Sequence, residues 1–219
     1  MTSNLVCQFR HADARDVDAA LPLICSSGPQ AFDYGFQRCG KSSRDFLRFA
    51  FTDGNGFLGY KNHTVATLNG KVVGILAVYN FSTYVRLTLG HLRQLWRFYP
   101  TSSLIGLITL GARLQSIMPP PNQTTHYVVH FGVAEGLRGS GIGRSLLTYQ
   151  YKKAQELGRT IYALDVSVEN PRAQSLYESF GFSVTAENEF SGPRGTVPNT
   201  RRMAMPVPAA QATGYHPPP

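Results

Sequence analysis

The stretch that decides the fold is VVHFGVAEGLRGSGIGRSLL, residues 128–147. It begins within an apolar strand (127–133), passes through a short polar turn and reaches a glycine-rich segment followed by a helix. Gly139, Gly141 and Gly143 keep side chains out of this segment, so that successive backbone N–H groups can point into one concavity. Because the first N–H groups of a helix have no internal partner and lie at the positive end of its dipole, the stretch predicts a phosphate-type anion site.

Two arginines flank the glycines and add full charges that suit phosphate. The expected anion loop consists of Arg138, Gly139, Ser140, Gly141, Ile142, Gly143, Arg144 and Ser145. A Walker-type loop requires a lysine after its last glycine, and here Gly143 is followed by Arg144. The G-x-G-x-G spacing also differs from the G-x-G-x-x-G of dinucleotide-binding folds. The loop alone leaves one other interpretation open, in which the glycines only form a tight turn.

A second motif, NPRAQSLYESFGF (170–182), follows a strand expected at 160–166. Asn170 is a favourable N-cap, Pro171 suits the first helical position, and Gly181 suits the end of the helix. The apolar residues between them fall at i, i+3, i+4 and i+7, so they share one helical face. These residues are Ala173, Leu176, Tyr177 and Phe180.

The two motifs R-G-x-G-I-G and N-x-x-A-x-x-L-Y-x-x-x-G-F occur in this order and about thirty residues apart. Together they resemble the acyl-CoA-binding core of the GNAT superfamily of N-acetyltransferases, sharply over 127–182 and in outline over 5–207. The resemblance implies an α/β (α+β) fold, with helices flanking a mixed, mostly antiparallel sheet of about seven strands. It further implies one acyltransferase domain over 1–207 and acetyl-CoA (CoA) as the cofactor.

By the same resemblance, the strand segment Phe131-Gly132-Val133 pairs with the pantetheine arm of the cofactor and leaves one backbone N–H for the thioester carbonyl. Gly132 fits a bulge or a close backbone approach in this strand. Asn170 and Ala173 are expected to bind the cofactor, and Tyr177 matches the family's general acid. A phenol can protonate a thiolate, although a tyrosine on an apolar helix face is also a common core residue.

An attacking ammonium must first lose a proton, and a base with a pKa near ~7 removes it best. His130, on the strand beside the expected thioester, is the first candidate for this base and for a substrate-binding residue. Glu135, Asp165 and His126 remain open as alternatives, as do a water chain and a residue of the insertion described below. A lone histidine on a strand is also often only a structural hydrogen-bonding residue.

In the family, the region between the first two helices lines the acceptor-substrate site; here these helices are expected at 13–26 and 42–51. Asp33 and Tyr34 lie between them, in a segment (30–39) whose secondary structure the sequence does not define. Both side chains would suit an amine substrate. The phenylalanines of this segment are at least as consistent with core packing.

The largest departure from the family pattern is an insertion at 81–125, after a hairpin (63–80) with an Asn-Gly turn. Its pattern predicts two helices, at 84–98 and 102–118. Three roles are open for it: a helical cover over the acceptor side, a contact in a homodimer, and a membrane-surface or partner-binding element. A cover would help to select the acceptor.

Further strands are expected at 4–10, 182–190 and 200–207, and the Pro/Ala-rich tail (208–219) is expected to be disordered. The chain has 219 residues, of which 42% are hydrophobic, enough for a folded core. Its three separated cysteines predict neither a disulfide framework nor a metal site. We expect a cytoplasmic protein, because the N-terminus has no signal-peptide pattern.

The net charge of +8 comes from scattered basic residues, which does not predict nucleic-acid binding, and the apolar runs are too short for a transmembrane segment. The predicted activity is transfer of an acetyl group from acetyl-CoA to a primary amine of a small molecule or peptide. Two alternatives remain open: a non-catalytic acyl-CoA-binding or regulatory domain, and an acyltransferase that uses a longer acyl-CoA.

Overall fold

A computed structural model describes residues 7–208. Its seven strands form one sheet in the order β1-β2-β3-β4-β5-β7-β6, and every neighbouring pair is antiparallel except β4 and β5. The predicted mixed, mostly antiparallel seven-stranded sheet is therefore confirmed. The strands are β1 (Gln8–His11), β2 (His63–Leu68), β3 (Lys71–Tyr79), β4 (Thr125–Val133), β5 (Ile161–Ser167), β6 (Ser183–Asn188) and β7 (Thr200–Pro206).

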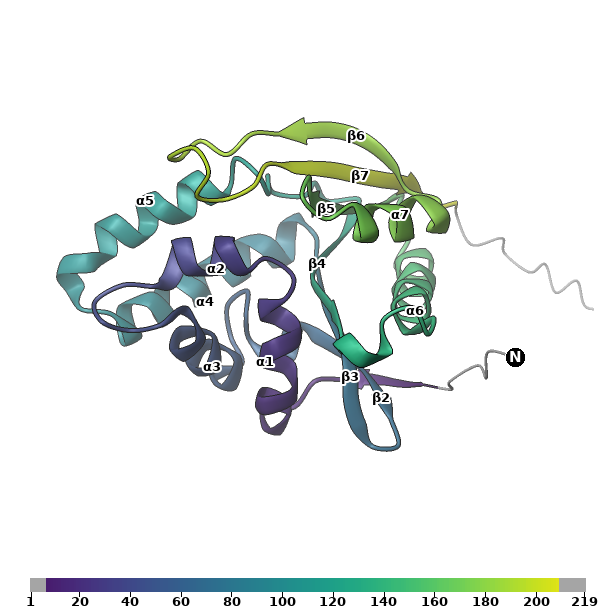
Figure 1. Cartoon of the computed structure of the whole chain (residues 1–219), viewed down its shortest axis with the longest axis horizontal. Coiled ribbons are helices and arrows are strands. Elements are labelled where there is room, and N and C mark those ends of the chain that lie inside the picture. Colours follow the sequence, from purple (N-terminus) through teal and green to yellow (C-terminus); the bar gives the residue numbers. More distant parts are fainter. Residues whose placement is uncertain (1–6, 209–219) are drawn as a thin grey trace, which may run out of the picture.

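Helices cover both faces of the sheet (Figure 1). The helices are α1 (Val17–Cys25), α2 (Pro29–Phe36), α3 (Ser43–Asp53), α4 (Phe81–Phe98), α5 (Leu104–Leu114), α6 (Ile142–Glu156) and α7 (Pro171–Phe180). The alternation of side chains along the strands explains the two layers. Val65 and Ile75 join the core beneath α1 and α3, whereas Ala66 and Leu76 join the core beneath α6 and α7.

Strands β4 and β5 diverge near their middle. Their parallel pairing ends at Val128 and Leu164, although both strands continue for several residues. Just beyond this point β4 carries a bulge against β3, where His130 adopts a positive φ of 53°. The second half of β4 therefore has an edge that faces β5 without pairing to it within the described chain.

Local sequence rules account for most element boundaries. The hairpin between β2 and β3 is confirmed, with Asn69 and Gly70 both at positive φ, as a type I′ turn requires. The helix expected at 42–51 is confirmed as α3, which Ser42 and Asp45 begin with a capping box.

The segment that the sequence left undefined, 30–39, is mostly helical, because α2 begins at Pro29. The Gly28-Pro29 pair ends the first helical region and also starts the next helix, where the missing proline N–H would have had no partner. The first strand and the C-terminal strands are confirmed within four residues of their expected limits. Residues 4–6 of the first predicted strand, and the predicted disordered tail from 209 onward, lie outside the described residues.

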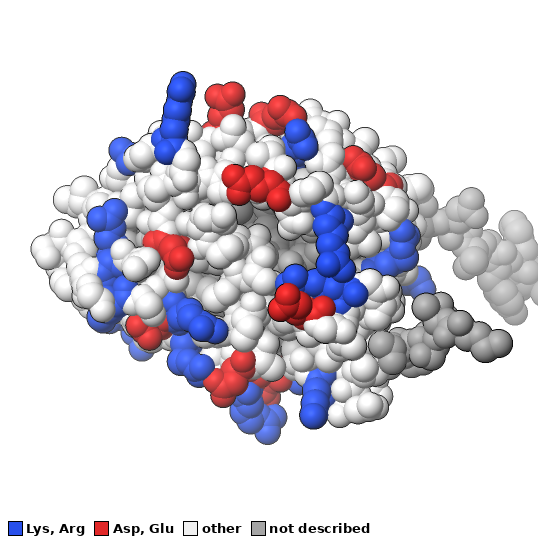
Figure 2. Space-filling model, in the orientation of Figure 1, with Lys and Arg blue, Asp and Glu red and all other residues white. Residues whose placement is uncertain are grey.

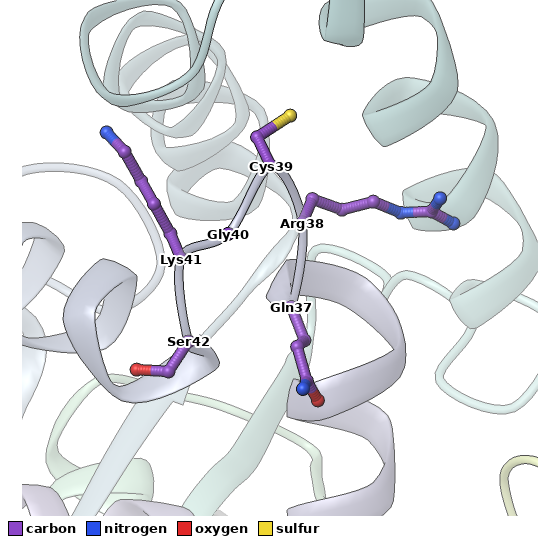
Figure 3. A pocket seen from close by; sticks show the side chains of 6 residues that line it. All are labelled: Gln37, Arg38, Cys39, Gly40, Lys41 and Ser42. Atoms are coloured by element: carbon purple, nitrogen blue, oxygen red, sulfur yellow. The ribbon is translucent and has the colours of Figure 1, made fainter.

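The insertion forms α4 and α5, which confirms the two predicted helices. In the described chain α4 packs against α3, and α5 packs against α2, on the side of the sheet that carries α1. The loop between α2 and α3 contacts the insertion at two points. Lys41 Nζ donates to Phe98 O at the end of α4 at 2.6 Å, and Cys39 Sγ lies 2.9 Å from Ser103 Oγ, just before α5. Figure 3 shows Cys39 and Lys41 extending to one side of this loop and Gln37 pointing to the other.

Candidate active site

The anion loop lies between the end of β4 and the start of α6. Gly139 and Gly141 have φ values of +91° and +88°, which L-residues rarely adopt, and Gly141 is the N-cap of α6. Within residues 7–208, no acceptor binds the backbone N–H groups of Gly139, Gly141, Ile142, Gly143 or Arg144. Unpaired amides at a helix N-terminus form an anion site, so the loop has the chemistry that its sequence predicts.

Three residues of the loop also have structural roles. Ser140 donates both its N–H and its hydroxyl to Leu137 O, at 3.3 and 2.6 Å, so its amide is not free for an anion. Gly143 allows α6 to approach β4, because a Cβ at this position would lie only 3.1 Å from Phe131 Cζ. Ser145 N donates to Gly141 O at 2.9 Å and so makes the first backbone hydrogen bond of α6.

Two of the basic side chains around the loop make hydrogen bonds to other parts of the protein. Arg144 Nη2 donates to Ser179 O at 2.9 Å and to Ser179 Oγ at 2.7 Å, so this arginine links α6 to α7. Arg138 is exposed and donates through Nε to Val133 O at 3.2 Å. Arg172, which the sequence interpretation missed, places Nη2 4.0 Å from where a Cβ on Gly139 would lie. Figure 2 shows Lys and Arg side chains gathered over the region of this loop and α7.

The segment of β4 before the loop makes a close backbone contact. A Cβ on Gly132 would lie 2.2 Å from Leu23 O, so only glycine allows α1 to approach β4 here. The sequence left a bulge or a close approach open for Gly132; the structure has the approach at Gly132 and the bulge at His130. The ring of Phe131 lies on the opposite side of β4, 6.1 Å from the ring of Tyr177.

Tyr177 lies on the inner face of α7 and is 7% exposed. Its ring is also 6.0 Å from that of Phe182, and its hydroxyl has no hydrogen-bond partner within residues 7–208. Burial raises the pKa of this phenol, so the group is neutral throughout the physiological range. At the start of α7, Asn170 Oδ1 accepts from Ala173 N at 3.1 Å, which leaves the Asn170 amide NH₂ available.

His130 and Tyr177 lie on opposite sides of the sheet. The Nδ1 atom of His130 is 3.1 Å from the Nε2 atom of His63. The far nitrogen of His63, Nδ1, is 2.9 Å from Gly59 O, which can only accept. His63 therefore carries its proton on Nδ1, and its Nε2 accepts from His130 Nδ1–H. Burial and the neighbouring histidines hold the pKa of His130 well below 6.5, so its Nε2 carries a free lone pair.

A model of the Acetyltransferase (GNAT) family matches residues 30–182, more than half of the chain. The chain belongs to the GNAT acetyltransferase family. Among curated proteins, none matches its sequence.

Solved GNAT structures share the fold at low sequence identity. An N-acetyltransferase from Staphylococcus aureus Mu50 is 16% identical with a TM-score of 0.65, covering 90% of this chain and 100% of its own. A GCN5-related N-acetyltransferase from Kribbella flavida is 20% identical with a TM-score of 0.54, covering 94% and 100%. The ribosomal-protein-S18-alanine N-acetyltransferase from Escherichia coli is 16% identical with a TM-score of 0.53, covering 96% and 100%.

In this GNAT acetyltransferase, the three other candidates for the general base lie in environments that differ from that of His130. Asp165 accepts from Arg202 at 2.7 and 3.0 Å and from Tyr127 OH at 2.5 Å, so both of its oxygens are bound. His126 is buried and 3.1 Å from the side-chain oxygen of Gln150 in α6. Glu135 is exposed in the turn after β4. Of the four candidates, only His130 combines partial burial with a free ring nitrogen.

The two acceptor residues expected from the sequence lie apart from His130. Asp33 accepts a hydrogen bond from Ser43 Oγ, and Tyr34 OH accepts from Arg113 Nη1 at 3.2 Å. Both line a shallow pocket of about 400 Å³ between α2 and the connection from β6 to β7, which contributes Thr196. The residue of α2 that reaches His130 is Phe32, at 5.9 Å between ring centroids. The sequence contained this aromatic residue but gave no sign of which face of α2 turns inward.

The candidate site therefore combines the anion loop with the unpaired edge of β4. The neutral phenol of Tyr177 lies on one side of β4, and the free lone pair of His130 lies on the other side. A donor with a pyrophosphate and an extended, amide-bearing arm fits the first two, and the family uses acetyl-CoA as its acyl donor. Among the described residues, no group of His, Cys, Asp and Glu is arranged to hold a metal ion.

Proposed function

We propose that this acetyltransferase transfers an acetyl group from acetyl-CoA to a primary amine of a small molecule or peptide. One observation supports this most: the free amides at the start of α6 follow the half of β4 whose edge toward β5 is unpaired. Tyr177 contacts one face of this half of β4 through Phe131, and His130 lies on the opposite face beside His63. An acid for the leaving group and a base for the nucleophile are thus available on the two sides of one strand.

In the proposed complex, the amides of the anion loop hold the pyrophosphate, with added charge from Arg138 and Arg172. The unpaired edge of β4 pairs with the pantetheine, and Asn170 donates to it through its amide NH₂. The residues proposed to hold the donor are Phe131, Gly132, Val133, Arg138, Gly139, Ser140, Gly141, Ile142, Gly143, Arg144, Ser145, Asn170, Ala173 and Tyr177. Ser140, Ser145 and Gly143 act in this set by fixing the shape of the loop.

The amine nitrogen attacks the thioester carbonyl, whose oxygen is stabilised by a backbone N–H of β4. His130 Nε2 takes a proton from the amine, and His63 supports this by holding His130 in the tautomer that leaves Nε2 free. Collapse of the tetrahedral intermediate breaks the C–S bond, and the Tyr177 phenol gives its proton to the departing thiolate. Asp33 and Tyr34 bind the more distant part of a larger acceptor, in the pocket that α2 shares with Thr196.

The direct test is release of free thiol from acetyl-CoA over a panel of amines, comparing wild type with Tyr177→Phe. We expect turnover by wild type on at least one amine and a fall of about 10²-fold or more in kcat for the variant. Full turnover by Tyr177→Phe would remove the acid role. CoA binding without turnover on any amine would favour the non-catalytic domain, and faster turnover with a longer acyl-CoA would favour the other alternative.

A further inference from the structure

The outer face of α4 carries a continuous apolar stripe. Phe81, Val85, Leu89, Leu92 and Trp96 are all exposed, and their spacing of i, i+4, i+8, i+11 and i+15 places them on one side of the helix. Leu89 is 67% exposed and Trp96 62%. Of the eleven large hydrophobic residues exposed in the described chain, eight belong to the insertion. Scattered exposed apolar residues are ordinary, but a stripe of this kind marks a binding surface.

The opposite face of α4 is already occupied by the protein. Leu87 and Leu95 are buried there, and Gln94 Nε2 donates to Ala50 O at 3.1 Å and to Asn55 O at 2.7 Å. The stripe is therefore not the side of α4 that packs against the rest of the protein. A second ligand or surface can bind it without displacing the helix.

Positive charge borders the stripe. Arg86, Arg93 and Arg97 each follow a stripe residue by one position, so they line one edge of it. Arg97 pairs with Asp53 at 2.5 Å, whereas Arg86 and Arg93 make no ion pair or hydrogen bond with any described residue. No Asp or Glu occurs in the sequence between Asp53 and Glu135.

This charge pattern distinguishes the possible occupants of the stripe. In a symmetric dimer, the same face of two copies would meet, and Arg86 and Arg93 would approach arginines with no carboxylate from the insertion to pair them. An anionic lipid surface supplies phosphates for the arginines and an acyl boundary for the apolar residues. No helix in the described residues is long and apolar enough to cross a membrane, so the contact would be along the helix side.

We propose that α4 docks the enzyme on an anionic membrane surface. The stripe enters the boundary between headgroups and acyl chains, and Arg86 and Arg93 bind lipid phosphates. Trp96 lies at the C-terminal end of the stripe, where an indole ring favours the interface.

The experiment uses the fluorescence of Trp96, the only tryptophan in the chain. The full chain is titrated with phosphatidylcholine vesicles that contain either no anionic lipid or about 30% phosphatidylglycerol, with sedimentation of the vesicles as a second readout. We expect a blue shift and co-sedimentation with the anionic vesicles only, weakened by salt. Leu89→Asn and the double variant Arg86→Gln/Arg93→Gln should each raise the lipid concentration for half-maximal binding at least tenfold.

The matched control is Leu157→Asn, which changes a leucine of similar exposure (59%) just after the C-terminal end of α6 and should bind like wild type. No shift and no co-sedimentation with anionic vesicles would overturn the proposal, as would equal binding to the uncharged vesicles. A blue shift that grows with protein concentration in the absence of lipid, together with a doubled mass in solution, would replace it with a second copy of the chain.

Discussion

At the residue scale, the pair His63–His130 carries the most specific chemistry of the site. The hydrogen bonds from Gly59 O through His63 to His130 fix both tautomers and leave one lone pair on His130. Because burial holds the pKa of His130 well below 6.5, this nitrogen is already deprotonated at neutral pH. A base with so low a pKa is a weak one, and its value in this mechanism lies in its position and in being unprotonated.

The first prediction concerns His130→Ala. We expect kcat/KM to fall about 10²-fold near pH 7 and the loss to shrink as the pH approaches the pKa of the amine, near ~10, where the substrate needs no base. The pH–rate profiles of both proteins measure this. His126→Gln is the matched control, since His126 lies on the same strand, is buried, and also has a lowered pKa. A parallel loss at every pH would contradict the role of His130 as base.

Individual contacts of the site differ in how far the sequence predicts them. The glycine spacing of the anion loop predicted free amides, because that depends on local backbone geometry. It did not predict that Ser140 binds Leu137 or that Arg144 binds Ser179, since these contacts depend on how the loop folds back and where α7 lies. Likewise, the neutralisation of Asp165 by Arg202 joins residues far apart in the sequence.

At the element scale, capping residues and turn residues predicted most helices and the hairpin. The one helix that the sequence left undefined, α2, begins with a Gly-Pro pair that also ends helices, so this local pattern has two outcomes. The bulge at His130 has no local cause in the sequence, because a histidine at positive φ is uncommon and depends on the pairing of β3 with β4.

The second prediction tests the expected role of α4 as a cover over the acceptor side. Gln94→Ala removes hydrogen bonds to Ala50 O, which is buried, and to Asn55 O, which is partly buried, so the free energy of unfolding should drop by about 2 kcal/mol. Chemical denaturation measures this, with Gln123→Ala as an exposed control. In the same variant, the KM for the amine should rise while CoA affinity stays within twofold. The reverse pattern, lost CoA affinity with an unchanged amine KM, would contradict the acceptor-side cover.

At the scale of the whole molecule, several neutral histidines lie in the interior, on both sides of the sheet. Burial lowers the pKa values of His63, His91 and His126 to about 4. In the unfolded chain these groups titrate near ~6.5. Below that pH the unfolded state therefore binds more protons than the folded state, and stability is lost as the pH falls from 6.5 toward 4.

The third prediction follows from this difference in protonation. Between pH 6.5 and 4.5, the free energy of unfolding should fall with decreasing pH, by up to about 1.4 kcal/mol per pH unit for each buried histidine. Urea denaturation across this range measures the slope. His126→Gln should reduce the slope, whereas Gln123→Ala, which removes no titratable group, should leave it unchanged. A wild-type stability that is flat between these pH values would show that the histidines become protonated in the folded state without penalty.

The central claim is that the free amides at the start of α6 bind the pyrophosphate of CoA, and calorimetry of CoA binding to Gly141→Glu tests it most directly. Gly158→Glu is the matched control: Gly158 also has a positive φ and open space around it, but it lies after the other end of α6. We predict that wild type and Gly158→Glu bind CoA equally and that Gly141→Glu loses at least about 100-fold in affinity, roughly 2.7 kcal/mol. Undiminished CoA binding by Gly141→Glu would contradict the account.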